Sequence, residues 1–384
     1  MKVLFVTNWY PSASEPTKAL WVREHAKAVS SYDDVVVLHF FGLYRDLETS
    51  WKIERESDEA ISDGIPTYRI RCRPPLVGRV LYPVYVCRVI QAIRRLSQEG
   101  FKPDVIHVHV YEPGVPAVVF GRLNRIPVVV SEHLSSFPMR TLGRLDLWKA
   151  RFAMRRAEMV LPVSAFLQQA LERYGIRARY QLMPNAVDTG LFRPPSDRIR
   201  RNALKQMLFV GQLAPVKDLG GLFKALCQLR RKRDDWRLDI VGEGQGRVEY
   251  ERQAAELKIS DVVTFRGMRS RQEVAEFMRE ADLFVLPSRV ETFSVPAAEA
   301  LAAGLPVVAT SCGGPQEFIT QETGLLVPPG DTEALSKGLD YMLDNLHLYP
   351  GSRISQYAVE RFARQSVGAK LHAVYRCVTE CNQN

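Results

Sequence analysis

The chain has 384 residues, which favours two domains because a single hydrophobic core rarely grows past roughly 250–300 residues. Apolar residues make up 46% and charged residues 25%, a composition that excludes the disordered and fibrous classes. The net charge is +9, and all of the excess lies in residues 1–200, with 29 Lys and Arg against 20 Asp and Glu. A basic half suits nucleic acid, an anionic membrane surface or an acidic substrate, and its sign alone does not choose among them.

The first eleven residues, MKVLFVTNWYP, are typical of a buried strand and not of a signal peptide, since they lack a long apolar core and a small-residue cleavage site. No apolar run approaches the ~18–20 residues of a membrane-spanning helix. The six cysteines form no CxxC pair, so we expect neither a zinc site nor a disulfide framework. A reducing cytoplasm is the expected compartment.

Short runs rich in β-branched residues alternate with helical patterns along both halves of the chain. In the first half the predicted strands are residues 3–7, 35–40, 105–110, 128–131 and 159–163. In the second half they are residues 206–210, 237–241, 262–266, 283–287 and 306–310. Runs that are apolar on both faces indicate parallel strands covered on both sides. The sequence therefore predicts an α/β protein with two doubly wound parallel sheets, whose ligands bind beyond the carboxyl ends of the strands in a cleft between the domains.

The predicted boundary is the segment FRPPSDRIRRN at residues 192–202, where paired prolines and charged residues interrupt the alternation. We expect domains at residues 1–195 and 196–360. Residues 361–384 are expected to form a helix that packs back on the first domain. Pro194 and Pro195 would then act as a hinge that allows the domains to close.

The segment SRVETFSVPAAEALAAGLPVVAT at 288–310 holds two glutamates around a predicted helix start. Ser294 is a suitable N-cap residue, Pro296 is tolerated in a first turn, and Gly304 ends the helix. The free amides of Phe293, Ser294 and Val295 form an anion site aided by the helix dipole. Glu299 lies about 7.5 Å further along the axis, and Glu291 precedes the cap. A single glutamate is more often a solvated surface residue, so the two glutamates indicate a binding site only if neighbouring loops also carry residues suited to the same ligand.

Three neighbouring loops carry residues suited to a nucleotide ligand. In FVGQLAPVKD, Gly211 allows a close backbone approach and Lys217 places a positive charge before the next helix. The turn TFRGMRS exposes the backbone from Gly267 to Arg269, which is suited to contact the flat edge of a nucleobase. The glycines of VGEGQG do not complete a dinucleotide fingerprint and are predicted to form a turn. CGGPQEF at 312–318 supplies another glycine-rich turn.

With these motifs in view, the second half resembles the donor domain of family 4 of the retaining nucleotide-sugar glycosyltransferases, which have the GT-B fold. The resemblance rests on four motifs in order over residues 206–335: VGQLAPVKD, ADLFVLPSRVETFSVPAAEALAAGLPVVAT, GGPQEFI and TGLLVPPGD. It implies that Glu299 binds the ribose, Glu291 the hydroxyls of the donor sugar, and Lys217 the diphosphate. Phe293 to Val295 would give backbone contacts to phosphate and sugar.

The first half resembles the family's acceptor domain more loosely, through NWYPSASEPTKALWVREHAKAV, PDVIHVHVYEPGVPA, VVVSEHLSSF and MPNAVDTGLF. His133 matches by position the histidine near the transferred sugar, which makes it a catalytic candidate with Lys217 and Glu291. His107 and His109 alternate in a strand and are expected in the core or at the cleft edge. Gln212 stands at a donor-binding position where arginine is usual, so one cation on the leaving diphosphate is missing unless another arginine, such as Arg289, substitutes.

Ser294 and Ala19 also depart from the family, since both stand where glycine is common. No Asp-x-Asp occurs, which argues against a carboxylate-bound metal, so we expect no metal and no cofactor besides the nucleoside diphosphate sugar. Catalysis would then depend on positive potential at the leaving diphosphate. The resemblance implies a front-face substitution with retention, and no glutamate is assigned as a general acid.

The expected activity is transfer of a sugar to an acceptor hydroxyl in cell-envelope glycan, polysaccharide or glycolipid synthesis. Arginines alternate with apolar residues at 72–96 and 139–157, a pattern that fits either a peripheral contact with an anionic membrane or a solvated amphipathic helix. Alternatives are a nucleotide-sugar epimerase or a sugar-phosphate synthase on the same scaffold, and a catalytically weakened membrane-surface binding module. Nucleic acid is disfavoured as a partner because no recognition motif accompanies the basic residues.

Overall fold

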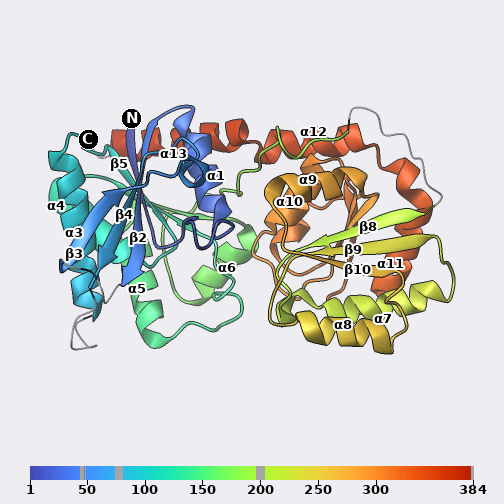
Figure 1. The fold of residues 1–384 in the computed structure, drawn as a ribbon. Coiled ribbons are helices and arrows are strands. Elements are labelled where there is room, and N and C mark those ends of the chain that lie inside the picture. The colour runs from blue at the N-terminus through green and yellow to red at the C-terminus, as the bar shows by residue number, and fades with distance from the viewer. Residues whose placement is uncertain (44–46, 48, 74–80, 196–203, 382–384) are drawn as a thin grey trace. The chain divides into compact units, whose positions relative to one another are not determined.

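A computed structural model describes residues 1–43, 47, 49–73, 81–195 and 204–381. The chain divides into two compact units, one formed by residues 1–186 with 364–384 and the other by residues 187–363. Each unit is an α/β domain built around its own mainly parallel sheet (Figure 1). The predicted fold class, two doubly wound α/β domains, is confirmed. Most of the predicted boundary segment, residues 196–202, lies outside the described residues.

The first unit contains a seven-stranded sheet with the order β3-β4-β2-β1-β5-β6-β7. All neighbouring strands run parallel except β3, which pairs antiparallel with β4 at the edge. The strands are β1 Lys2–Thr7, β2 Asp34–Leu43, β3 Trp51–Arg55, β4 Thr67–Cys72, β5 Val105–His109, β6 Val128–Glu132 and β7 Met159–Pro162. Every residue of β5 and β6 is buried, as expected for central strands that are covered on both faces. The buried residues include the polar side chains His107, His109, Ser131 and Glu132.

Helices cover both faces of this sheet (Figure 1). They are α1 Leu20–Ser30, α2 Glu59–Ser62, α3 Leu81–Gln98, α4 Gly114–Asn124, α5 Arg144–Met154, α6 Ala165–Arg173 and α13 Arg364–Cys381. Helix α13 packs against α1, and the two share a core with Phe5 of β1. The approach is close at Gly368, where an added Cβ would lie 2.2 Å from the carbonyl oxygen of Ala28. The C-terminal helix is thus an integral part of the first unit.

The second unit contains a six-stranded parallel sheet with the order β10-β9-β8-β11-β12-β13. Its strands are β8 Lys205–Val210, β9 Trp236–Val241, β10 Val263–Gly267, β11 Leu283–Leu286, β12 Val307–Thr310 and β13 Gly324–Val327. The order reverses between β8 and β11, so the loops after these strands lie at the topological switch point where ligands bind in such sheets.

The second unit has six α-helices and three short 3₁₀ turns among its described residues. They are η2 Pro215–Lys217, α7 Leu219–Arg230, α8 Arg247–Glu256, α9 Arg271–Glu280, α10 Val295–Ala302, η3 Gly314–Glu317, α11 Thr332–Asn345, η4 Leu346–Leu348 and α12 Gly351–Phe362. Helix α11 packs against α7, and α12 packs against α10. Among the helices of the described chain, none has the length and apolar character that crossing a bilayer requires.

Candidate functional site

Glu291 is the centre of a polar cluster in the second unit, in the loop that follows β11. Its Oε1 lies 2.6 Å from the Nζ of Lys217 and accepts a hydrogen bond of 2.7 Å from the hydroxyl of Ser288. Ser288 is completely buried, and Glu291 is 8% exposed. Lys217 ends η2, in the loop after β8, so two neighbouring strands of the switch point each deliver one charge. The structure therefore brings together two residues that lie 74 positions apart in the sequence.

The glycine-rich turn at 312–314 fixes the backbone of Glu291. The amide of Glu291 donates to the carbonyl of Cys312 at 3.0 Å, and the amide of Gly314 donates to the carbonyl of Glu291 at 2.9 Å. A Cβ at Gly314 would lie only 2.1 Å from the carbonyl oxygen of Thr292, so only glycine fits. The turn predicted from CGGPQEF thus holds the loop that carries Glu291.

Ser294 precedes α10, but its side chain does not cap the helix. Its backbone is left-handed, with φ of 75°, and its buried hydroxyl has no hydrogen-bond partner among the described residues. Ser294 is the N-cap residue, as predicted, but the expected side-chain cap is absent, because a capping serine normally has an extended backbone and not a left-handed one. The amides of Ser294 and Val295 donate no hydrogen bond to the described part of the chain, as is usual for a helix N-terminus. They remain available to an anion.

Glu299 lies in the second turn of α10 and is 8% exposed. Its Oε1 is 3.2 Å from Nη2 of Arg271, the first residue of α9, whose guanidinium also stacks on Phe192 at 5.4 Å. A largely buried carboxylate needs such a partner, because burial without one is costly. Sequence reasoning missed Arg271 and Ser288, although a carboxylate on an otherwise apolar helix was a signal that a cation lies near.

The remaining predicted donor residues lie in the same loops with different environments. Gly211 follows β8, and Gln212 after it is exposed. Arg289 pairs with Asp218 at 2.9 Å. Arg269, in the loop before α9, makes an ion pair of 3.7 Å with Glu273 in the first turn of that helix. The side chain of Phe293 is buried against Phe318, so only its backbone is offered to a ligand.

His133 lies in the first unit, in the loop directly after β6. Burial lowers its pKa well below the usual value, so the imidazole is neutral. The preceding Glu132 is completely buried and accepts backbone hydrogen bonds from His133, Leu134 and Tyr111. Burial raises the pKa of Glu132 to about 7 despite these three donors. Glu132 therefore fixes the loop that carries His133.

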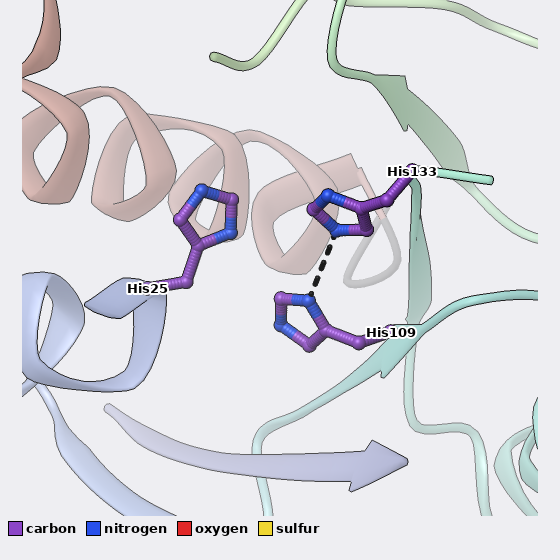
Figure 2. Close-up of side chains that lie close together, drawn as sticks. All are labelled: His25, His109 and His133. Carbon is purple, nitrogen blue, oxygen red and sulfur yellow. Dashed lines mark hydrogen bonds between the residues drawn. The ribbon is translucent and has the colours of Figure 1, made fainter. Parts of the chain in front are cut away.

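The ring of His133 lies beside two other buried imidazoles, His109 at the end of β5 and His25 on α1 (Figure 2). His109 Nδ1 is 3.5 Å from His133 Nε2. His25 Nε2 is 3.0 Å from the carbonyl oxygen of Pro184, which assigns the proton to Nε2. Val110, next to His109, has φ of 65°, an unusual conformation for a β-branched residue. The sequence did not predict this cluster, because its members are far apart and follow no metal-binding spacing.

Comparison with known proteins agrees with this architecture. The chain superposes on HepE from Anabaena, solved in complex with UDP, with a TM-score of 0.77 and 22% identity over 98% of this chain and all of that one. A likeness at this identity defines the GT-B class of two-domain α/β folds. Two family models cover the units in turn: a glycosyl transferase 4-like domain at residues 22–186 and glycosyl transferases group 1 at residues 197–359.

Curated relatives give the same family. The chain is 30% identical over 298 residues to a GDP-mannose-dependent alpha-mannosyltransferase of Mycobacterium tuberculosis, covering 72% of each chain. It is 26% identical to the putative teichuronic acid biosynthesis glycosyltransferase TuaC of Bacillus subtilis, covering 88% of each. It is 32% identical to an MMP alpha-(1->4)-mannosyltransferase of Mycolicibacterium hassiacum, where it spans 57% of the relative's length. The chain belongs to the group 1 glycosyltransferases.

Proposed function

We propose that this protein transfers a sugar from a nucleoside diphosphate sugar to an acceptor hydroxyl with retention of the anomeric configuration. The observation that supports this most is the arrangement of Lys217, Glu291 and the N-terminus of α10. The ammonium of Lys217 lies 2.6 Å from Glu291, the backbone amides that begin α10 follow Glu291 in the same loop, and Glu299 lies about 7.5 Å further along the helix axis. This length suits a diphosphate at the amides, a ribose at Glu299 and a sugar at Glu291.

The proposed chemistry depends on charge that develops on the leaving diphosphate. Lys217 and the N-terminal amides of α10 would stabilise that charge in a preorganised way, which is typically the largest catalytic contribution. Glu291 would accept hydrogen bonds from the hydroxyls of the donor sugar, and His133 would contact the transferred sugar. No divalent ion at the diphosphate is needed in this scheme, because Lys217 supplies the positive charge.

Calorimetry with a panel of nucleoside diphosphates tests the donor site. We expect one of them to bind, and Glu299→Ala to weaken that binding because the ribose loses its acceptor. Glu322→Ala removes an exposed carboxylate of the same unit and serves as the matched control. Absence of binding to any nucleoside diphosphate, or equal binding by Glu299→Ala, would refute the donor site. The product's anomeric proton coupling in NMR then separates retention from inversion.

The acceptor is proposed to be a lipid-linked or envelope glycan at the cytoplasmic membrane surface. The supporting observation is α5, where Trp148 and Leu145 are 49% and 56% exposed beside the exposed Arg144 and Arg151. Apolar side chains flanked by arginines suit an anionic bilayer. Residues 74–80 of the other basic segment lie outside the described residues. Flotation with anionic vesicles should retain the wild type and lose a Leu145→Ser, Trp148→Ser variant, whereas equal flotation would contradict the membrane contact.

A further inference from the structure

We propose that His25, His109 and His133 form a binding site for a divalent transition-metal ion, with zinc as the best-fitting metal. The three imidazoles come from α1, the end of β5 and the loop after β6 (Figure 2). One ring nitrogen from each lies within 4.8 Å of the others. This site goes beyond the proposed transferase chemistry, which places no metal at the donor diphosphate.

The distances suit zinc. Two nitrogens bonded to zinc at about 2.0–2.1 Å with tetrahedral angles lie roughly 3.3–3.4 Å apart. His109 Nδ1 and His133 Nε2 are separated by 3.5 Å, so these two ligands are already at nearly that spacing. The third nitrogen, from His25, would reach the same spacing from the other two through a shift of at most roughly 1.5 Å. The ring centroids form a nearly equilateral triangle with sides of 5.5, 5.7 and 5.7 Å.

The protonation of His25 also suits metal binding. Its Nε2 proton is directed to the carbonyl of Pro184, which leaves the lone pair on Nδ1. This nitrogen lies on the edge of the ring that faces His109 and His133 (Figure 2). It has no hydrogen-bond partner among the described residues, and burying a ring nitrogen without a partner is unfavourable. A carbonyl that accepts the second imidazole proton is the usual outer partner of a metal-bound histidine.

The burial and the ligand type select the metal class. His25 and His109 are 0% exposed and His133 is 7% exposed, and burial favours the neutral imidazole that metals require. Three imidazole nitrogens suit zinc, cobalt, nickel or copper, whereas magnesium and calcium prefer oxygen ligands. Three protein ligands leave one coordination position for water or a hydroxyl. A bound ion would also hold the ring of His133 in one orientation.

Metal uptake by the tag-free full chain tests the site. The background carries Cys87→Ser and Cys381→Ser, because exposed thiols also bind zinc. After chelator treatment and dialysis against zinc, we expect about one zinc ion per chain by elemental analysis and a tetrahedral, nitrogen-ligated spectrum with cobalt. Magnesium should not be retained. His25→Ala, His109→Ala and His133→Ala should each lower zinc affinity at least about 100-fold, whereas His347→Ala, in an exposed turn of the other unit, should not.

Removal of a buried ring can itself unfold the first unit, so each variant is checked by near-ultraviolet circular dichroism without metal. A second readout does not depend on the variants: zinc should raise the thermal midpoint of the parent chain, and magnesium should not. Uptake far below one zinc ion per chain, or a cobalt spectrum unchanged in folded His109→Ala and His133→Ala, would overturn the site. The three histidines would then be a hydrogen-bonded core cluster only.

Discussion

Lys217 is the residue on which the nucleotide-sugar proposal depends most, because its ammonium is the cation closest to Glu291. Lys217→Ala should weaken nucleoside diphosphate binding about 10- to 150-fold, the equivalent of a charge-assisted hydrogen bond of roughly 1.5–3 kcal/mol. Lys224→Ala removes an exposed lysine from α7 in the same unit and should leave binding unchanged. Calorimetry that gives equal affinities for Lys217→Ala and the parent would show that the diphosphate binds elsewhere.

Ser294 occupies a backbone conformation that glycine adopts without cost. At φ of 75° a side chain with a Cβ is strained by roughly 1–2 kcal/mol, and the serine hydroxyl gains no hydrogen bond in return. We therefore expect Ser294→Gly to be neutral or stabilising in urea unfolding. Ser294→Val should be less stable than Ser294→Gly by about 1–2 kcal/mol, because β-branched residues tolerate this region worst. An equal stability of the two variants would contradict the left-handed backbone.

His39 gives the first unit a defined response to acid. Burial first, and then the charge of Arg69, lower its pKa to about 3 from an ordinary 6.5. His39 binds a proton more readily in the unfolded chain than in the folded one. The stability that the folded state has with neutral His39 is therefore fully present above pH 6.5 and is lost as the pH falls towards 3. The slope is at most about 1.4 kcal/mol per pH unit.

His39→Gln should reduce this dependence, because glutamine has no group that titrates in that range. The measurement is the free energy of unfolding of parent and variant, compared between pH 7 and pH 4. Curves that stay parallel over this range would show that His39 is already protonated in the folded state or contributes nothing to acid sensitivity.

The turn that begins η3 and the loop before α10 act as one element, because Gly314 lies directly against the backbone of Thr292. Gly314→Ala should displace the segment that carries Glu291 and Phe293, since the new Cβ would meet a carbonyl oxygen at 2.1 Å. We expect loss of both thermal stability and nucleotide-sugar binding. Gly143→Ala, where the nearest side-chain atom would lie 3.7 Å away, is the control. A Gly314→Ala variant with full affinity would show that this turn does not position the site.

Ten strands were predicted from apolar runs, and each has a counterpart shifted by at most a few residues. For most of them the pattern worked because both faces of the strand are buried. The exception is the edge strand β10, which was predicted although Thr264 and Arg266 are exposed. The pattern failed for β3 and β4, where charged residues such as Glu54 and Arg69 alternate with apolar ones near the sheet edge. It also failed for β13, which has only four residues, two of them partly exposed. Short or half-exposed strands carry too weak a period for this argument.

Contacts between distant residues were the part of the site that the sequence could not provide. The motifs placed Lys217 and Glu291 in loops of one sheet, and the switch-point rule made their proximity predictable. The pairing of Glu299 with Arg271 depends on where the first turn of α9 lies relative to α10, which no local pattern encodes. The conformation of Ser294 was also not predictable, because serine is an ordinary N-cap residue and gives no sign of a positive φ.

Across the whole chain, the two units differ in their chemistry. The five buried histidines, His25, His39, His107, His109 and His133, all belong to the first unit. The ion pairs and glycine turns proposed for the donor belong to the second. The C-terminal helix is part of the first unit, where the hydroxyl of Tyr375 on α13 lies 2.6 Å from Nδ1 of His107 on β5. The last helix of the chain therefore belongs to the histidine-rich first unit, although it follows the second unit in the sequence.

The most direct measurement of the central claim is amide hydrogen exchange with and without the nucleoside diphosphate that calorimetry selects. If the diphosphate binds at the N-terminus of α10, exchange should slow at Phe293, Ser294 and Val295, and also around Lys217. The first turn of α11, which also begins a helix in the same unit, should not change. Protection absent from residues 293–295, or confined to other helix starts, would contradict the proposed donor site.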